Sequence, residues 1–115
     1  MTNIKDQLLA VIKETKDDPN DIVCFYQPVI DYLTGNEVVY PGWNQRSCSE
    51  PIQCTIDELP TREFDAGYGS PNGEPTICFS PKYVYIRCQY DGSEWFEAVP
   101  RHPEYVTKPI PWLGG

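Results

Sequence analysis

Basic residues, histidine and long apolar runs are all scarce in this sequence of 115 residues. No run of about 18 apolar residues occurs, so the sequence predicts no membrane-spanning helix. Nine basic residues stand against seventeen acidic ones, which gives a net charge of −8. Such a charge repels nucleic-acid phosphates and anionic membranes. We therefore expect neither nucleic acid nor a membrane as a direct partner.

Motifs that hold metals or phosphates are missing as well. Structural zinc favours closely spaced cysteine pairs, and the separations Cys48-x5-Cys54 and Cys78-x9-Cys88 do not match that pattern. The glycine-rich segment 67–73 has no phosphate-binding lysine and is followed by Glu74, so we interpret it as a shaped turn. We therefore expect no cofactor and no metal.

Residues suited to catalysis are also few. The single histidine, His102, lies between Arg101 and Pro103, where an exposed position is expected. A cysteine nucleophile would need this histidine beside it and a third group to orient the ring, and nothing local indicates such a set. A pair of catalytic carboxylates would need a cleft that separates their pKa values, which exposed loop acids do not provide. The sequence therefore predicts that the protein is not an enzyme. A cysteine-dependent enzyme is the third of three functional hypotheses, after the two that are described below.

The sequence does contain enough apolar and aromatic residues, 40% and 13%, to build a core. An apolar stripe with helical spacing predicts an N-terminal helix that begins at Thr2 or Asn3 and ends near Asp17. The stripe consists of Ile4, Leu8, Val11 and Ile12.

From residue 22 the pattern changes to that of strands. A continuous β-branched and aromatic run predicts a buried strand over 22–26. The pattern of residues 29–40 predicts a hairpin, and a helix over 29–33 is the alternative. A short strand is expected over 52–56, followed by a long loop over 57–75. Runs over 76–79, 83–90 and 94–99 predict three strands, with a tight turn at Asp91-Gly92.

These elements predict a single α+β domain over residues 1–115, in which the N-terminal helix packs on an antiparallel sheet containing a C-terminal three-stranded meander. We expect an ordered core over about 2–102 and a proline-rich tail over 103–115. The chain starts without a secretory signal, so we expect a cytoplasmic protein. Cys24, Cys78 and Cys88 should be buried and free, whereas Cys48 and Cys54 lie in loop-like surroundings and are the pair that oxidation would join.

Two groups of residues are candidates for binding a protein partner. The first is acidic: the stretch 31–74 holds eight acids and two bases, Arg46 and Arg62. The second is aromatic, on the strand 83–90 and the next strand, where tyrosine and tryptophan are suited to anchor an interface. Each group also has a plain structural explanation, namely solubility and sheet packing. The candidate residues are Asp57, Glu58, Glu63, Asp65, Tyr83, Tyr85 and Trp95.

Three short segments resemble a pattern found in small phage and prophage proteins that have no assigned activity. These segments are Phe64-Asp65-Ala66-Gly67-Tyr68-Gly69, Tyr90-Asp91-Gly92-Ser93-Glu94-Trp95 and Val99-Pro100-Arg101-His102-Pro103. The resemblance covers the C-terminal half and transfers no site residue. It implies an inhibitor of host nucleic-acid enzymes or defence systems.

Our leading hypothesis is a non-enzymatic inhibitor, a nucleic-acid mimic that occupies a basic nucleic-acid-binding surface of a host protein. The acids would steer association and the aromatic residues would supply a desolvated centre. The alternative is a small-molecule-binding protein that sequesters its ligand in an aromatic pocket between helix and sheet. Either a monomer or a dimer fits both readings.

Overall fold

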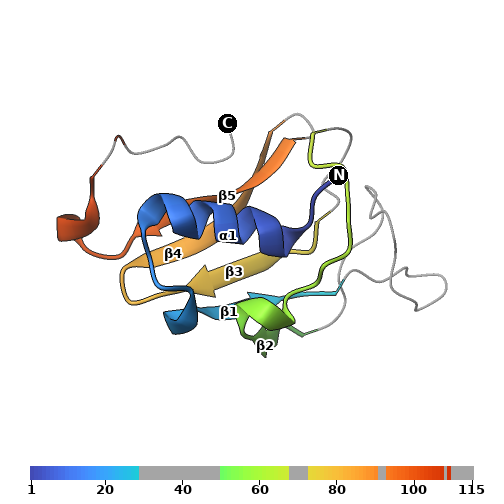
Figure 1. Ribbon diagram of the computed structural model, residues 1–115, viewed down its shortest axis with the longest axis horizontal. Coiled ribbons are helices and arrows are strands. Elements are labelled where there is room, and N and C mark those ends of the chain that lie inside the picture. Colours follow the sequence, from blue (N-terminus) through green and yellow to red (C-terminus); the bar gives the residue numbers. More distant parts are fainter. Residues whose placement is uncertain (29–49, 68–72, 91–92, 108, 110–115) are drawn as a thin grey trace.

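The computed structural model describes residues 1–28, 50–67, 73–90, 93–107 and 109. In this part of the chain, one α-helix packs on a five-stranded antiparallel sheet of order β2-β1-β3-β4-β5 (Figure 1). The α+β class and the adjacent strands β3, β4 and β5 confirm the predicted architecture. The elements are α1 (Ile4–Thr15), η1 (Pro19–Asp21), β1 (Val23–Tyr26), β2 (Ile52–Cys54), η2 (Ile56–Glu58), β3 (Thr76–Phe79), β4 (Tyr83–Tyr90), β5 (Ser93–Pro100) and η3 (Pro103–Tyr105).

Helix α1 begins and ends with recognisable caps. The side chain of Asn3 accepts a hydrogen bond of 2.8 Å from the backbone N–H of Asp6, which satisfies one of the free donors of the first turn. Lys16 ends the helix in the left-handed conformation, with φ of 58°. Between the caps, Ile4, Leu8 and Ile12 are buried against the sheet, so the predicted stripe is confirmed.

The two faces of the sheet follow from strand alternation and register. Cys54, Cys24, Cys78, Tyr85 and Ala98 lie side by side across the five strands, and all are buried on the face of the sheet that carries α1. Their sequence neighbours point to the opposite side. The core therefore lies between α1 and this one face of the sheet.

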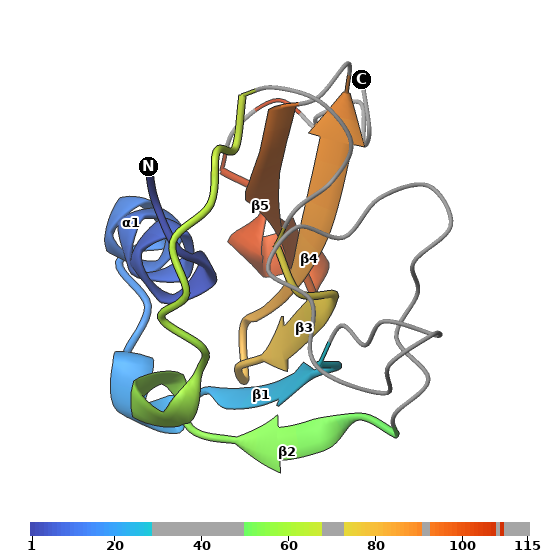
Figure 2. The same ribbon diagram turned by 90° about the vertical axis from the view of Figure 1, so that its right-hand side faces the viewer.

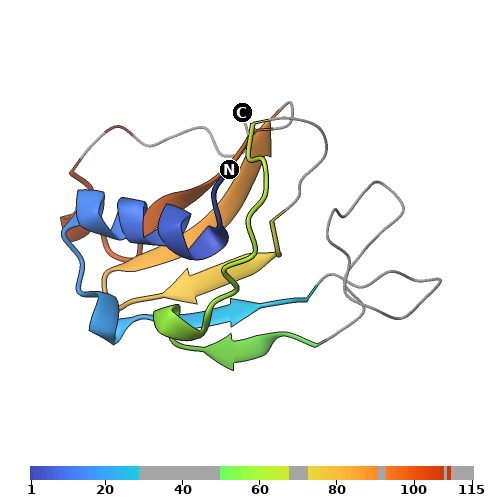
Figure 3. The same cartoon turned by 45° about the vertical axis from the view of Figure 1, so that its right-hand side comes forward.

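A second segment covers the same face beside α1. Residues 60–67, which we call the covering segment, run from η2 past the N-terminal end of α1 (Figures 2 and 3). Thr2 and Phe64 exchange two backbone hydrogen bonds, of 3.0 and 2.8 Å, and the Phe64 side chain is fully buried. The first part of the loop predicted over 57–75 therefore packs against the core face of the sheet, beside α1.

The structure confirms some expectations about the cysteines and corrects one. Cys24, Cys78 and Cys88 are buried and free, as predicted. The expected loop-like surroundings of Cys54 are wrong, because it lies on the strand predicted over 52–56, pairs with Cys24 in the sheet and is 9% exposed. Burial, with the nearby Cys24 and Glu58, raises the pKa of the Cys54 thiol to about 11. Cys48 lies outside the described residues.

The remaining differences concern the ends of elements. The strand predicted over 52–56 stops at Cys54, because Thr55 and Glu58 form a capping box that starts η2. The predicted tail packs at its start, since the Tyr105 ring lies 6.3 Å from that of Tyr83. The hairpin over 29–40 and the turn at residues 91 and 92 lie outside the described residues. In the described part, no helix is both long and apolar enough to cross a membrane.

Candidate interaction surfaces

Four of the predicted acidic residues form one exposed series, which we call the acid row. Asp57 and Glu58 lie on η2, and Glu63 and Asp65 lie on the covering segment. The apolar residues between them, Ile56, Leu59 and Phe64, are buried in the core. Because the apolar side chains point inward, the four carboxylates are held on the outside of the layer that contains α1.

The acid row has limited local compensation. Lys5 Nζ lies 3.5 Å from Asp57 Oδ1, but the Asp57 side chain is 94% exposed, so this pair is screened by water. The carboxylates of Glu58 and Asp65 accept hydrogen bonds from the backbone N–H groups of Thr55 and Gly67. Asp57 therefore has a cationic neighbour, but one that contributes little.

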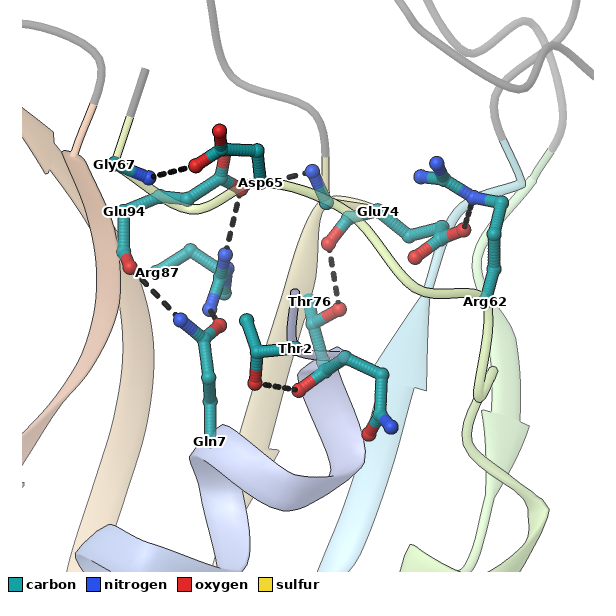
Figure 4. Close-up of polar contacts among 11 residues, drawn as sticks. Thr2, Gln7, Arg62, Asp65, Gly67, Glu74, Thr76, Arg87 and Glu94 are labelled. Atoms are coloured by element: carbon teal, nitrogen blue, oxygen red, sulfur yellow. Dashed lines mark hydrogen bonds and ion pairs between the residues drawn. The ribbon is translucent and has the colours of Figure 1, made fainter.

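Arg62, in the middle of the acid row, points inward. Its Nε donates a 2.8 Å hydrogen bond to Glu74 Oε1, and the Glu74 carboxylate is buried. A second pair lies deeper under α1, where Arg87 Nη2 is 2.8 Å from Glu94 Oε1. We call these four residues the ionic cluster (Figure 4).

Further hydrogen bonds tie the ionic cluster to α1 and to the chain before β3. Arg87 also donates to Gln7 Oε1 on α1, and Gln7 Nε2 donates to the Glu94 carbonyl oxygen at 2.9 Å. Glu94 Oε1 accepts from the Gly73 N–H at 2.8 Å. The cluster therefore joins α1, the covering segment, the chain before β3, and strands β4 and β5.

The two guanidinium groups of the cluster also pack on aromatic rings. Arg62 and Arg87 each lie 5.9 Å from the centre of the Phe64 ring, and Arg87 lies 4.7 Å from that of Phe96. Burial lowers the pKa of Arg87, and the neighbouring Glu94 opposes that shift. Among the described residues, Glu74 Oε2 is a buried side-chain oxygen without a hydrogen-bond partner.

The crowding of the cluster gives a testable result at Gly73. A Cβ there would lie 2.8 Å from Glu94 Oε1 and 2.9 Å from both Arg87 Nη2 and Phe64 Cζ. Because these three side chains hold one another in place, we expect Gly73→Ala to lower the free energy of unfolding by about 1–3 kcal/mol. Urea denaturation measures the change. Gly67→Ala is the control, since its nearest contact is Asp65 Oδ1 at 3.7 Å, and equal effects at the two glycines would contradict this account.

The sequence reading did not identify the ionic cluster, although it contained a signal for it. Alternation places Arg87 on the face of β4 that carries Tyr83 and Tyr85. It places Glu94 on the face of β5 that carries Phe96 and Ala98. A charge on a buried face requires a partner, so these two residues are expected to pair once this face is known to lie under α1.

Two of the three aromatic candidates are not available to a partner. Tyr83 is 9% exposed and Tyr85 is fully buried, so the prediction that they anchor a partner is wrong for this conformation. The Tyr85 hydroxyl donates a 2.7 Å hydrogen bond to Asp17 Oδ2, and burial raises the pKa of this hydroxyl. A tyrosine on a strand beneath a helix packs its ring in the core and needs only one polar contact at its tip.

Trp95 lies on the opposite side of the sheet from α1. Its ring faces the same way as Glu97, and Trp95 Nε1 donates to Glu97 Oε1 at 2.9 Å. Outward positions of β1, β3, β4 and β5 share this side, which we call the open face. Its residues are Val23, Phe25, Ile77, Phe79, Val84, Ile86, Cys88, Tyr90, Ser93, Trp95, Glu97 and Val99, of which Cys88 is buried.

A groove of about 450 Å³ lies at the β1–β3 end of the open face. Phe25, Ile77, Phe79, Pro51 and Pro75 are among the residues that line it. The pocket predicted between helix and sheet is not found in the described part of the chain, because Ile4, Leu8, Tyr85 and other core side chains fill that space. The acid row and Trp95 thus lie on opposite sides of the molecule.

The histidine shows no arrangement for catalysis in the described residues. His102 is exposed, as predicted, and its ring contacts Tyr105 at 5.8 Å between centres. The buried thiols of Cys24 and Cys78 pack against each other in the sheet, and their hydrogen bond together with burial raises the pKa of Cys78. No group of three or more potential metal ligands occurs in the described part of the chain.

Neither a protein-family model, nor a curated protein, nor a solved structure matches this chain. The resemblance to small phage proteins therefore stays a prediction.

Proposed function

We propose that this protein is a non-enzymatic acidic inhibitor of the phage type, which occupies a basic nucleic-acid-binding surface of a host defence protein. The acid row of Asp57, Glu58, Glu63 and Asp65 is the proposed contact surface. The acid row mimics nucleic acid in that its carboxylates occupy the positions on the partner where nucleic-acid phosphates bind.

The observation that carries this proposal is that two arginines form ion pairs inside the protein. Arg62 and Arg87 bind Glu74 and Glu94 inside the protein, so these four charges cancel there. The other fifteen acids and seven bases of the sequence hold the whole net charge of −8. Arg62, the base closest in sequence to the acid row, is thereby directed away from it.

The way in which the acid row is held also supports a recognition role. Buried Ile56, Leu59 and Phe64 fix the backbone on which the acids sit, so little ordering is needed when a partner binds. Glu63 and Asp65 are two residues apart on an extended segment, which corresponds to about 6.6 Å at ~3.3 Å per residue. The two carboxylates therefore lie on the length scale of charge in DNA, where one strand carries one charge per about 3.4 Å of helix axis.

Charge reversal in the acid row tests the proposal. A pull-down from bacterial lysate identifies the partner, and competition with duplex DNA shows whether the same surface binds nucleic acid. We then expect Asp57→Lys with Glu63→Lys to reduce the association rate constant at least tenfold in about 25 mM salt. The reduction should largely disappear near 500 mM salt, because screening removes long-range steering.

The matched control reverses two acids away from the row. Glu14→Lys with Glu104→Lys makes the same change in net charge on exposed residues of α1 and η3. If the control slows association as much as the row variant, only total charge matters. If neither variant slows it, or if duplex DNA does not compete, the proposed mechanism is wrong.

A further inference from the structure

Three buried cysteines form a row across the sheet. Cys54 on β2, Cys24 on β1 and Cys78 on β3 are cross-strand partners, and their side chains share the face that carries α1. These three strands are neighbours at one edge of the sheet (Figure 1). Neither the acid row nor the ionic cluster includes these residues. Because Cys24 has a thiol on each side, the register alone allows it to join either neighbour.

The direction of the backbone hydrogen bonds distinguishes the two neighbours of Cys24. The Gln27 N–H donates to the Pro75 carbonyl oxygen at 3.0 Å, so Gln27 directs its backbone groups toward the β3 side. These groups alternate in direction from residue to residue along an antiparallel strand. Cys24, three residues earlier, therefore directs its own groups toward β2. Its pairing with Cys78 is of the non-hydrogen-bonded kind.

Pairs of the non-hydrogen-bonded kind bring side chains closest together. Directly opposite Cβ atoms lie about 4.5–5.5 Å apart, and the shorter separations belong to non-hydrogen-bonded pairs. A disulfide needs Cβ atoms about 3.5–4.5 Å apart, so Cys24 and Cys78 have to move least to form one. Their thiols already share a hydrogen bond, which lowers the pKa of Cys24 and raises the pKa of Cys78. The Cys78 thiol is thus the donor, and the Cys24 sulfur is the acceptor.

We propose that Cys24 and Cys78 are a site of reversible oxidation by peroxide, which joins β1 to β3 through a cross-strand disulfide. The Cys24 thiolate attacks one oxygen of hydrogen peroxide, the O–O bond breaks, and the departing hydroxide combines with the proton that Cys24 has released. The Cys78 sulfur then attacks the sulfenic sulfur of Cys24, and the hydroxyl leaves as water with the Cys78 proton. The two thiols are oxidised to one disulfide, and the peroxide is reduced to two waters.

The sheet also provides a route for the oxidant and a reason for reversal. Strand β2 has three residues and, in the described part of the chain, pairs only with β1. A short strand with one sheet neighbour opens at a lower free energy than the central strands, and its opening uncovers Cys24. The Cα atoms of a non-hydrogen-bonded pair lie about 4.5 Å apart, at the short end of the range for disulfides, so the bond is strained and easily reduced. The proposal is independent of the proposed function, since it concerns the core.

Peptide mapping of the full wild-type chain tests the proposal. Trypsin places Cys24, Cys78 and Cys88 on the separate peptides 17–46, 63–82 and 88–101, and the other two cysteines together on 47–62. The native protein is treated with hydrogen peroxide, its remaining thiols are alkylated, and the digest is analysed by mass spectrometry. We expect the link between 17–46 and 63–82 to be at least about ten times as abundant as that between 17–46 and 47–62. Dithiothreitol should restore both thiols.

The unfolded chain provides the contrasting result. In concentrated urea the sheet is absent and the shortest loop closes most readily, which favours a disulfide between Cys48 and Cys54. That disulfide lies within peptide 47–62 and links no two peptides. We therefore expect the link between 17–46 and 63–82 to be the main product in the native protein and a minor one in urea.

Two alanine variants separate the proposed pair from burial in general. Cys78→Ala should abolish the disulfide of Cys24, whereas Cys88→Ala should leave it unchanged. Cys88 is also buried, but the residue opposite it on β5 is Trp95 rather than a cysteine. Far-UV circular dichroism reports whether each variant folds. Should Cys78→Ala fail to fold, the wild-type map in buffer and in urea decides the question.

Three results would overturn the proposal. The first is a native protein in which Cys24 and Cys78 stay thiols, or gain only oxygen, under peroxide that converts free cysteine to cystine. The second is a main link between 17–46 and 47–62, which would join Cys24 to a different thiol. The third is the same set of links in buffer and in urea, which would mean that the folded sheet does not direct the pairing. None of these results bears on the acid row, whose association rates can be measured with dithiothreitol present.

Discussion

Replacing Arg87 by methionine is expected to lower the free energy of unfolding by about 3–5 kcal/mol, the largest effect of any single substitution considered for this protein. Arg87 supplies the positive charge for the buried carboxylate of Glu94 and donates to Gln7 on α1. Methionine fills a similar volume beside Phe96 but leaves that carboxylate buried without its cation. The cost arises from the stranded charge rather than from lost packing.

Urea denaturation of two further variants separates these causes. Arg87→Met combined with Glu94→Gln removes both charges and keeps an oxygen that accepts from the Gly73 N–H, so it should regain most of the lost stability. Lys13→Met removes an exposed positive charge and should change stability by less than about 0.5 kcal/mol. If the double variant is no more stable than Arg87→Met alone, the ion pair does not explain the effect.

Replacing Leu8 by alanine should lower the free energy of unfolding by about 2–5 kcal/mol. Leu8 is fully buried between α1 and the sheet, where it packs with Ile4 and Ile12. Truncation removes apolar contacts and leaves a cavity that a sheet and a capped helix cannot readily close.

The adjacent Leu9 provides the control for Leu8. It has the same side chain on the same helix but points outward and is 37% exposed. Leu9→Ala should therefore change stability by less than about 1 kcal/mol, since only part of its surface leaves water on folding. Equal losses at the two positions would mean that α1 does not dock on the sheet as described.

Much of the secondary structure was predictable because its signals are local. The stripe of Ile4, Leu8 and Ile12 requires only helical spacing, and Asn3 requires only a free N–H group at the first turn. Strands β3 and β4 were predicted at their observed limits, and β5 within one residue at each end. The end of β2 was not, because the capping box of Thr55 and Glu58 competes with strand extension.

The candidate site was less predictable, since exposure depends on which face of each strand is covered. In β4, alternation separates Tyr83 and Tyr85 from Val84 and Ile86, yet both sets are apolar enough to be buried. The pattern therefore could not decide which set faces α1. The acids of the row were correctly expected to be exposed, because the intervening Ile56, Leu59 and Phe64 leave them no other side.

By itself, the sequence determined the helix, the strands, their alternation and the excess of negative charge, since these follow from neighbouring residues and from composition. Only the tertiary structure decided where α1 docks. That one placement buried Tyr85, left Trp95 on the opposite side of the sheet, and brought Arg62, Glu74, Arg87 and Glu94 together. The physical reason is that one helix can cover only one face of a sheet, and no local pattern states which apolar face it covers.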